Sequence, residues 1–166
     1  RGIRAARTPY IIAMHGDCCF ATKHELKKLV APIIRTRSII ATYGLIEHPI
    51  WVWKQYPFWE KYLFTLNAGE ITTGFVGKID CYQREAALSI GGYDAHAYAQ
   101  IGGEDADFHL RLKNIGLIIP TNARVVHLHD LNPNFSFLQL MEKKKGETFS
   151  FETPKGVQKY KIVSIN

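Results

Sequence analysis

Residues 10–43, YIIAMHGDCCFATKHELKKLVAPIIRTRSIIATY, decide the fold that we expect for this chain. The stretch opens on Tyr10 to Met14, a short run of β-branched and aromatic residues that is typical of a strand buried on both faces. A second strand is predicted from Ser38 to Tyr43, with a loop and an amphipathic segment between the two. The order strand, loop, helix, strand predicts an α/β domain in three layers.

The helix between these strands carries signals for its own start and end. Thr22 and Glu25 have the spacing of a capping box, in which a hydroxyl and a carboxylate satisfy the first backbone amides of a helix. Apolar residues recur at helical spacing from Leu26 to Ile33. We expect Pro32 to limit this helix, because a proline in a helix interior removes a backbone donor and crowds the preceding turn.

Beyond residue 43 the chain alternates short strands with short helices. Strands are expected at 71–76, 78–82, 117–119 and 123–128, helices at 84–90, 107–115 and 135–141, and a hairpin around 154–156. Gly91 and Gly92 end the first of these helices and Gly116 ends the second, because glycine readily adopts the left-handed conformation that follows a helix. Pro120 separates the last two strands.

Residues 51–64, WVWKQYPFWEKYLF, fit neither a helical nor a strand period. They hold all three Trp residues of the chain and four further aromatic residues. One interpretation is an excursion that covers the core. Another is an aromatic wall for a sugar or lipid acceptor, or a patch that touches a membrane surface, because such rings combine a large apolar face with polar edges.

The composition indicates one domain with a basic tail. Of the 166 residues, 46% are apolar and 22% are charged, which suits a single buried core. We place the domain at 1–141 and a basic tail or hairpin at 142–166, where six Lys and three Glu supply half of the net charge of +6. The aromatic and basic residues lack the patterns of nucleic-acid readers, so we expect no nucleic-acid partner, and a phosphate-bearing small molecule is an equally good use for the excess positive charge.

Cysteine usage and hydropathy suggest a location. Cys18, Cys19 and Cys81 are three in number and two are adjacent, which favours free thiols in a reducing compartment. The sequence has no run of about 18 uninterrupted apolar residues, and it does not open on a signal peptide. We therefore expect a cytoplasmic location, extending to peripheral contact with the inner face of a membrane.

A cluster of acidic residues stands at the start of the helix predicted at 107–115. Glu104, Asp105 and Asp107 follow Gly102 and Gly103 directly. Acids in a first turn often only complement the helix dipole, which stabilises by about 0.3–1 kcal/mol each. Three carboxylates exceed what capping needs and repel one another, so we expect at least one to face a cleft. A carboxylate held by a rigid helix at the mouth of a loop is well placed to act as a general base.

Two groups of histidines and acids follow predicted strands. His15 and Asp17 flank Gly16 after the first strand, and His127 shares one face with His129 at the end of the last strand. Ligands of open α/β sheets bind at the carboxyl ends of the strands. A histidine on a strand is most often structural, but two such groups at separate strand ends favour a shared ion such as Mn²⁺, Zn²⁺ or Mg²⁺.

Four blocks of sequence, taken together, resemble glycosyltransferase family 2. In chain order they are RGIRAARTPYIIAMHGD, GKIDCYQREAALSIGGYD, IGGEDADFHLRLKNIG and ARVVHLHD. The resemblance covers residues 1 to about 130, with a gap over the aromatic stretch, and the order of the blocks makes it specific. It implies a three-layer α/β fold of the GT-A type with a mixed sheet.

The resemblance also implies a metal site. The family's Asp-x-Asp motif, which holds a divalent ion and the diphosphate of the donor, falls on residues 15–17. Asp17 is therefore the expected metal or diphosphate contact. His15 replaces the first acid and is expected either to bind the ion or to hydrogen-bond the donor. His127 falls where a histidine completes the metal site of related enzymes, with His129 as the second choice.

By the same resemblance, the family's catalytic base is similar to Asp105. Four further positions are expected to contact substrate: Gly103, Glu104, Asp94 and Arg84. Gly103 lets an acceptor approach the base closely, and Glu104 and Asp94 are expected to bind acceptor hydroxyls. Arg84 is expected to pair either with a phosphate or with the acidic cluster.

The implied activity is the inverting transfer of a single sugar from a nucleotide-diphosphate donor to a carbohydrate or other hydroxyl acceptor, assisted by Mn²⁺ or Mg²⁺. The Gln-x-x-Arg-Trp signature of processive synthases is absent, which favours transfer of one sugar. The segment that the family places ahead of Ala6 is also missing. We therefore expect an incomplete catalytic domain that lacks the half for the nucleotide base, and self-association through its exposed sheet edge.

Two other functions fit the same residues. One is a GT-A-like binding module without turnover. The other is a metal-dependent phosphoester hydrolase, in which the histidines and acids hold an ion that activates water.

Overall fold

The structure is a computed structural model that describes residues 2–98, 103–128, 148–153 and 156–161. Its centre is a six-stranded sheet in the order β1-β5-β3-β6-β2, with β4 paired to β3 beside this path. The strands are β1 (Tyr10–Ala13), β2 (Cys18–Phe20), β3 (Ile39–Glu47), β4 (Ile71–Thr73), β5 (Asp80–Gln83) and β6 (Leu117–His127). The central strand β3 is buried along most of its length. The prediction that the first strand is buried on both faces was wrong, because β1 is a partly exposed outer strand of this sheet.

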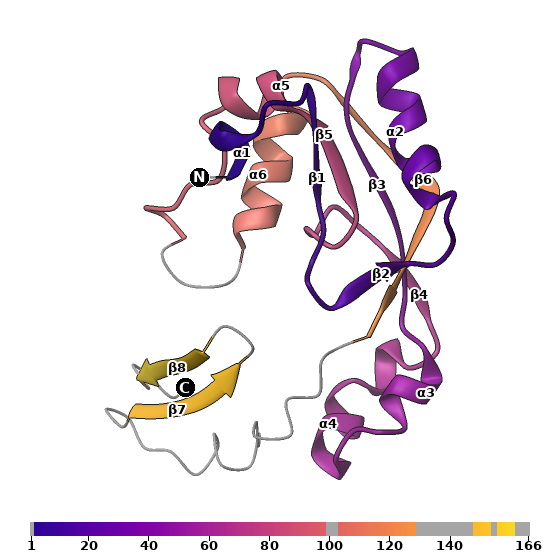
Figure 1. Ribbon diagram of the computed structural model, residues 1–166, viewed down its shortest axis with the longest axis vertical. Helices are drawn as coiled ribbons and strands as arrows, with labels where there is room; N and C mark the ends of the chain where they lie inside the picture. The colour runs from indigo at the N-terminus through magenta and orange to yellow at the C-terminus, as the bar shows by residue number, and fades with distance from the viewer. Residues whose placement is uncertain (1, 99–102, 129–147, 154–155, 162–166) are drawn as a thin grey trace.

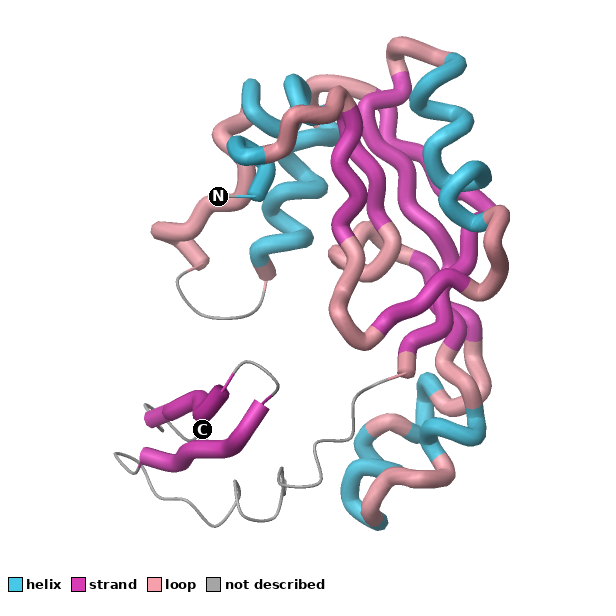
Figure 2. The backbone as a smooth tube through the Cα atoms, in the orientation of Figure 1, coloured by secondary structure: helices cyan, strands magenta, loops and turns pink. Residues whose placement is uncertain are grey.

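The sheet is mixed and curled, which confirms the expected α/β class. β3 pairs parallel with β6 and antiparallel with β5, and β5 pairs antiparallel with β1. β1, β3 and β6 therefore run in one direction and end at one edge. Residues 14–17 alone carry the chain from β1 to β2, the two outer strands of the main path (Figure 2). Because this segment spans at most about 18 Å, the strand ends are drawn together.

Helices cover both faces of the sheet (Figure 1). They are α1 (Gly2–Ala5), α2 (Glu25–Arg35), α5 (Arg84–Ser89) and α6 (Glu104–Lys113). α2 lies on one face, where Leu29 and Ile33 are buried in a core with residues of β3, β5 and β6. α1, α5 and α6 lie on the other face, where Phe108 and Leu112 are fully buried in a second core. The expected three layers are therefore present.

A buried carboxylate ties α2 to the sheet. Glu25 is 1% exposed and accepts hydrogen bonds from the Thr22 hydroxyl at 2.6 Å, the Lys28 ammonium group at 2.9 Å and the Arg124 backbone amide at 2.8 Å. Burial alone raises the pKa of Glu25, but these hydrogen bonds outweigh it and hold the pKa below its ordinary value. The predicted capping box is not formed, because the helix begins at Glu25, after its cap residue His24, and the carboxylate turns to β6.

Two prolines lie inside elements where the sequence predicted a break. α2 continues through Pro32 as far as Arg35, and the burial of Ile33 offsets the cost of the missing backbone bond. β6 is one strand through Pro120, so the two strands predicted on either side of it are joined. Its register with β3 is irregular just after Tyr43, and such an irregularity tolerates a residue without a backbone N–H.

The aromatic stretch and its neighbours form two short helices and a 3₁₀ turn between the end of β3 and the start of β4 (Figure 1). These elements are α3 (Ile50–Trp53), α4 (Phe58–Leu63) and η1 (Thr65–Asn67). Val52 and Tyr56 are buried, so part of the stretch covers the core as predicted. Its outer side exposes large apolar residues, namely Ile50, Trp51, Phe58, Tyr62, Leu63 and Leu66. The stretch is therefore both a cover and an exposed apolar surface.

The basic tail contains the predicted hairpin. β7 (Thr148–Thr153) and β8 (Gly156–Lys161) pair antiparallel, with Thr153 opposite Gly156. The short helix predicted at 135–141 lies outside the described residues. Among the helices that the structure describes, none has the length and apolar character that crossing a membrane requires.

We predict that Glu25→Ala lowers the free energy of unfolding by about 1–3 kcal/mol, because the buried Arg124 amide loses its acceptor. Chemical denaturation followed by circular dichroism measures this loss. Glu85→Ala is the control, since Glu85 is exposed and pairs with Arg84 at the surface, where removal costs less than about 1 kcal/mol. Equal losses in the two variants would show that Glu25 does not anchor α2.

Candidate functional site

The turn at residues 14–17 reaches the edge where β1, β3 and β6 end. Asp17 precedes β2, which pairs antiparallel with β6 so that Cys18 lies opposite His127. The Leu128 amide donates a hydrogen bond to the Asp17 carbonyl at 2.8 Å and closes this corner. The fold thus joins two strand ends that are 110 residues apart in the chain.

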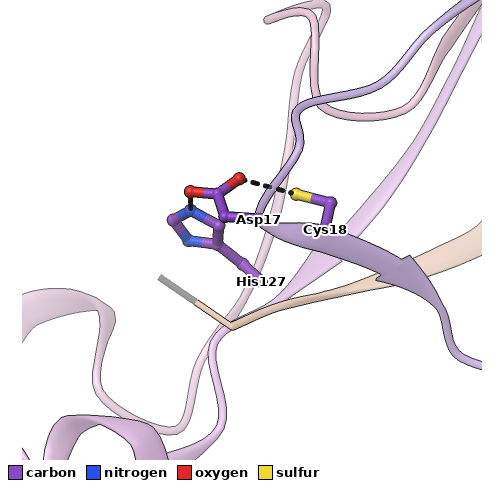
Figure 3. A group of neighbouring side chains, drawn as sticks. All are labelled: Asp17, Cys18 and His127. Atoms are coloured by element: carbon purple, nitrogen blue, oxygen red, sulfur yellow. Dashed lines mark hydrogen bonds and ion pairs between the residues drawn. The ribbon is translucent and has the colours of Figure 1, made fainter. Parts of the chain in front are cut away.

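Asp17, Cys18 and His127 form a candidate metal-binding triad (Figure 3). His127 Nε2 lies 3.0 Å from Asp17 Oδ2, and Cys18 Sγ lies 3.6 Å from Asp17 Oδ1. All three ligand atoms lie within 4.8 Å of one another. The structure therefore brings together the two predicted metal ligands, Asp17 and His127, and adds a thiol that was not predicted.

Charge within the triad favours an ionised carboxylate. Burial alone raises the pKa of Asp17, but His127 and Cys18 outweigh it and hold the pKa below its ordinary value. Burial and the Asp17 carboxylate raise the pKa of the Cys18 thiol to about 12. The thiol is therefore protonated at neutral pH unless a cation replaces its proton.

A second group of side chains meets above Gly77. This glycine has a φ of +73°, and the point where a Cβ would lie is 3.2 Å from both His15 Nε2 and Asp105 Oδ2. An imidazole and a carboxylate therefore converge over a residue that has no side chain to separate them. Because His15 and Asp17 are two positions apart on one turn, this group adjoins the triad.

Asp105 is held in the first turn of α6. The helix begins at Glu104, earlier than predicted, directly after Gly103 with a φ of +88°. Burial and the Glu104 carboxylate raise the pKa of Asp105, while His15 and a hydrogen bond from Tyr93 partly oppose this rise. A carboxylate whose pKa is raised binds a proton more readily than an ordinary Asp and so suits a general base.

Asp80 is a buried carboxyl group at the start of β5, close to Asp105. Its Oδ2 accepts a hydrogen bond from the Gly77 amide at 2.5 Å, and its Oδ1 has no hydrogen-bond partner among the described residues. Burial raises the pKa of Asp80 to about 7, with the Gly77 amide opposing the rise and the Asp105 carboxylate adding to it. Asp80 therefore holds in place the turn that His15 and Asp105 face.

A pocket opens beside the triad, against the segment of α3 and α4. Its lining combines an aromatic wall of Trp53, Tyr56 and Phe64 with the polar side chains of His48, Asn67, Lys78 and His127. The pocket is open to solvent, and the volume inside it is about 130 Å³. Lys78 follows Gly77 in the chain and His127 belongs to the triad, so the pocket adjoins both groups of side chains.

The remaining predicted substrate contacts are only partly gathered here. Gly103 and Glu104 stand next to Asp105 at the start of α6. The exposed carboxylate of Asp94 accepts hydrogen bonds from the backbone amides of His96 and Ala97 at 2.9 and 3.0 Å. Asp94 thus shapes its own turn, and its contact with an acceptor stays a prediction. His129 lies outside the described residues.

Arg84 lies at the opposite edge of the sheet from these groups. It follows Gln83, which pairs with the start of β1, whereas the site lies beyond the end of β1. Its guanidinium group pairs with Glu85 at 2.7 Å. Of the two pairings expected for Arg84, the one with the acidic cluster is not formed, and Asp107 of that cluster pairs with Arg111 instead. The contact of Arg84 with a phosphate stays a prediction.

Reasoning from the sequence missed four residues of the site: Cys18, His48, Lys78 and Asp80. His48 follows β3 as Asp17 follows β1, so the rule of strand ends points to it once β3 is known to extend to Glu47. Asp80 carries the signal of a charged residue between the apolar neighbours Ile79 and Cys81. No comparable signal marks Lys78.

The donor atoms of the triad fit a divalent cation but not equally well for every ion. The resemblance implies Mn²⁺ or Mg²⁺, and Asp17 and His127 offer the carboxylate and imidazole that Mn²⁺ accepts. Mg²⁺ prefers an octahedron of oxygen atoms, of which the triad supplies few. The Cys18 thiol is a donor that neither ion favours.

Comparison of the chain with models of known protein families finds no match, and a search of curated proteins finds none either. A function for this chain is therefore inferred from its residues and their geometry. That geometry places a candidate metal-binding triad, a carboxylate with a raised pKa and a pocket containing a lysine at one edge of the sheet.

We predict that Asp80→Asn changes how stability depends on pH. The pKa of Asp80 rises from 3.8 to about 7 on folding, so between these values the folded chain holds a proton that the unfolded chain has released. The contribution of Asp80 is therefore fully present below the lower value and falls by up to about 1.4 kcal/mol per pH unit towards the upper one. Asn keeps an acceptor for the Gly77 amide and does not titrate, so the variant should lose less stability over this window. Denaturation at a series of pH values gives the two slopes, and identical slopes would contradict the prediction.

We predict that Gly77→Ala separates His15 from Asp105. The new methyl group meets both side chains at 3.2 Å. The positive φ of residue 77 also costs a non-glycine residue about 1–2 kcal/mol of stability. Denaturation measures the stability, and the imidazole resonances of His15 report its surroundings by NMR. Gly16→Ala is the matched control, because a Cβ at residue 16 meets nothing within 4 Å. If both variants leave the His15 resonances unchanged, His15 and Asp105 do not meet at Gly77.

Proposed function

We propose that this chain carries catalytic residues of an inverting glycosyltransferase related to family 2, with a GT-A-like fold. One observation supports the proposal most strongly. The turn of residues 15–17 contacts His127 through Asp17 and approaches Asp105 through His15. The residues that the resemblance identifies come from three separate parts of the chain: 15–17, Asp105 and His127. Their meeting at one sheet edge is what a shared functional site requires.

In this proposal Asp105 removes the proton of the acceptor hydroxyl. An inverting transfer needs one base on the face of the sugar opposite the leaving group. Burial and Glu104 raise the pKa of Asp105, which strengthens it as a base. His15 and Asp105 converge over Gly77, so the reacting hydroxyl of the acceptor is assigned to their side of the site.

The leaving diphosphate is assigned to the side of Asp17 and Lys78. Lys78 lines the pocket together with His127, and its ammonium group suits a phosphate oxygen. Asp17 and His127 would hold a divalent cation, which supplies positive charge to the departing oxygens when bound. His15 Nε2 lies over Gly77, the residue before Lys78 in the chain, and is assigned a hydrogen bond to the donor.

The pocket favours a carbohydrate over a simple phosphoester. The rings of Trp53, Tyr56 and Phe64 offer apolar faces against which a sugar packs, and the side chain of Asn67 offers a donor and an acceptor for its hydroxyl groups. A hydrolase of small phosphoesters has no use for such a wall. The pocket therefore supports transfer of a sugar over the hydrolase alternative.

A cytoplasmic location at the inner face of a membrane is part of the same proposal. Cys18, Cys19 and Cys81 are free thiols in the structure, as a reducing compartment would keep them. The exposed apolar side chains of α3 and α4 suit contact with a membrane surface.

We predict that Asp105→Asn lowers the rate of sugar transfer by the intact protein at least about 100-fold, because Asn cannot accept the proton. Binding of nucleoside diphosphate in the presence of Mn²⁺ should change little, since the triad and Lys78 are untouched. The rate is measured as nucleoside diphosphate released from a panel of nucleotide sugars, and the binding by calorimetry.

Asp107→Asn is the matched control from the same turn of α6. Asp107 pairs with Arg111 at 2.5 Å, so this variant should lose some stability and keep near-normal turnover. Normal turnover by Asp105→Asn would remove Asp105 from the role of base. Equal loss of turnover in both variants would attribute the effect to the helix and not to one carboxylate.

A further inference from the structure

We propose that Asp17, Cys18 and His127 bind a thiolate-accepting cation of the Zn²⁺ type, and that His48 and Thr72 orient the imidazole of His127. The resemblance to glycosyltransferases implies neither the sulfur ligand nor the orienting pair. The proposal goes beyond the proposed function, because it stands on the geometry of the triad whether or not the chain transfers a sugar.

The donor atoms of the triad lie within 4.8 Å of one another, close to the separations around a tetrahedral ion. Zn–N and Zn–O bonds of about 2.0–2.1 Å and Zn–S bonds of about 2.3 Å place neighbouring ligand atoms about 3.3–3.6 Å apart. In the triad, His127 Nε2 lies 3.0 Å from Asp17 Oδ2, and Cys18 Sγ lies 3.6 Å from Asp17 Oδ1. Small rotations of the side chains therefore bring all three atoms onto one ion.

The types of donor select among the divalent ions. A thiolate, an imidazole and a carboxylate are all ordinary ligands of Zn²⁺, whereas Mg²⁺ requires oxygen atoms and Mn²⁺ prefers oxygen and nitrogen. Cys18 is buried, and the Asp17 carboxylate lies between its sulfur and the His127 ring (Figure 3). A cation between the Cys18 sulfur and the Asp17 carboxylate is attracted by both groups. It therefore stabilises the thiolate form of Cys18 next to the carboxylate, where the two negative charges would otherwise repel each other.

The neighbours of His127 prepare its imidazole for coordination. While Nε2 faces Asp17, the other nitrogen, Nδ1, lies 3.4 Å from His48 Nδ1, and His48 Nε2 lies 3.0 Å from the Thr72 hydroxyl. Without an ion, Nε2 donates its proton to the Asp17 carboxylate. When a cation takes the place of that proton, the proton of His127 lies on Nδ1 and is donated to His48, whose own Nε2 proton is donated to Thr72. These neighbours would therefore support the form of His127 that binds a metal through Nε2 and fix the direction of the ring.

Three protein ligands leave room for one ligand from outside. Structural Zn²⁺ sites use four protein ligands, whereas sites that act on a bound molecule use three and keep the fourth position for it. His127 and Lys78 line the same pocket beside the triad. The exchangeable ligand that suits this position is an anionic oxygen, such as that of a phosphate group.

Titration of the intact, reduced and metal-stripped protein with Co²⁺ tests the proposal. Co²⁺ occupies Zn²⁺ sites, and its bond to a thiolate gives an absorption band in the near ultraviolet that Zn²⁺ lacks. We expect an equimolar amount of Co²⁺ to produce this band and an equimolar amount of Zn²⁺ to remove it. Mn²⁺ and Mg²⁺ in large excess should leave the band in place.

Three variants assign the ligands. Cys18→Ser should lose the band and bind Zn²⁺ at least about 10-fold more weakly, whereas His48→Gln should keep the band and bind about 10–100-fold more weakly. Cys19→Ser is the matched control, because Cys19 is exposed and its side chain points to the opposite face of β2. It should retain both the band and the affinity.

Wild-type protein without the band, or a band that Mn²⁺ removes as readily as Zn²⁺, would overturn the proposal without recourse to any variant. A folded Cys18→Ser variant with wild-type affinity for Zn²⁺ would remove Cys18 from the site. Because none of these measurements uses sugar transfer, their outcome is separate from that of the proposed function.

Discussion

A short connection between the two outer strands constrains the whole site. Residues 14–17 join β1 to β2 across the ends of β5, β3 and β6. Four strand spacings of about 4.8 Å would separate these strands by about 19 Å in a flat sheet. An extended segment of this length spans at most about 18 Å, and the real turn is not fully extended. The strand ends must therefore curl towards one another, and the turn must lie across them.

The path of this turn explains why its two polar side chains meet different partners. The Cys18 amide donates a hydrogen bond to the His15 carbonyl at 3.2 Å, so the chain turns between His15 and Asp17, and the two residues stand at different strand ends. His15 reaches the glycine turn that precedes β5, where α6 delivers Asp105, and Asp17 reaches the end of β6, where His127 stands. The same curl places both partners at one edge, although they lie on segments far apart in the chain.

The carboxyl groups of Asp80 and Asp105 have raised pKa values, because burial outweighs the groups that stabilise their charges. Buried Asp80 accepts a hydrogen bond from the Gly77 amide, and burial together with Glu104 raises the pKa of Asp105. Glu25, on the other face of the sheet, shows the opposite balance, because three hydrogen bonds lower its pKa despite burial. A carboxylate that is fully satisfied anchors the fold, whereas one that is left partly unsatisfied remains able to take up a proton.

The sequence by itself determined the α/β class, the three layers and the hairpin of the tail. It also placed Asp17, His127 and Asp105 at the ends of strands and at the start of a helix. These features follow from local signals, namely the period of the hydrophobic residues, the turn residues and the rule of strand ends. The sequence misplaced local details that tertiary contacts override: Glu25 leaves its helix terminus for the Arg124 amide, and α2 continues through Pro32. Only the tertiary structure decided which ends meet. The thiol of Cys18, the imidazole of His48 and the carboxyl group of Asp80 join the site through strand pairing and sheet curl, which couple residues too distant in the chain for any local pattern to connect.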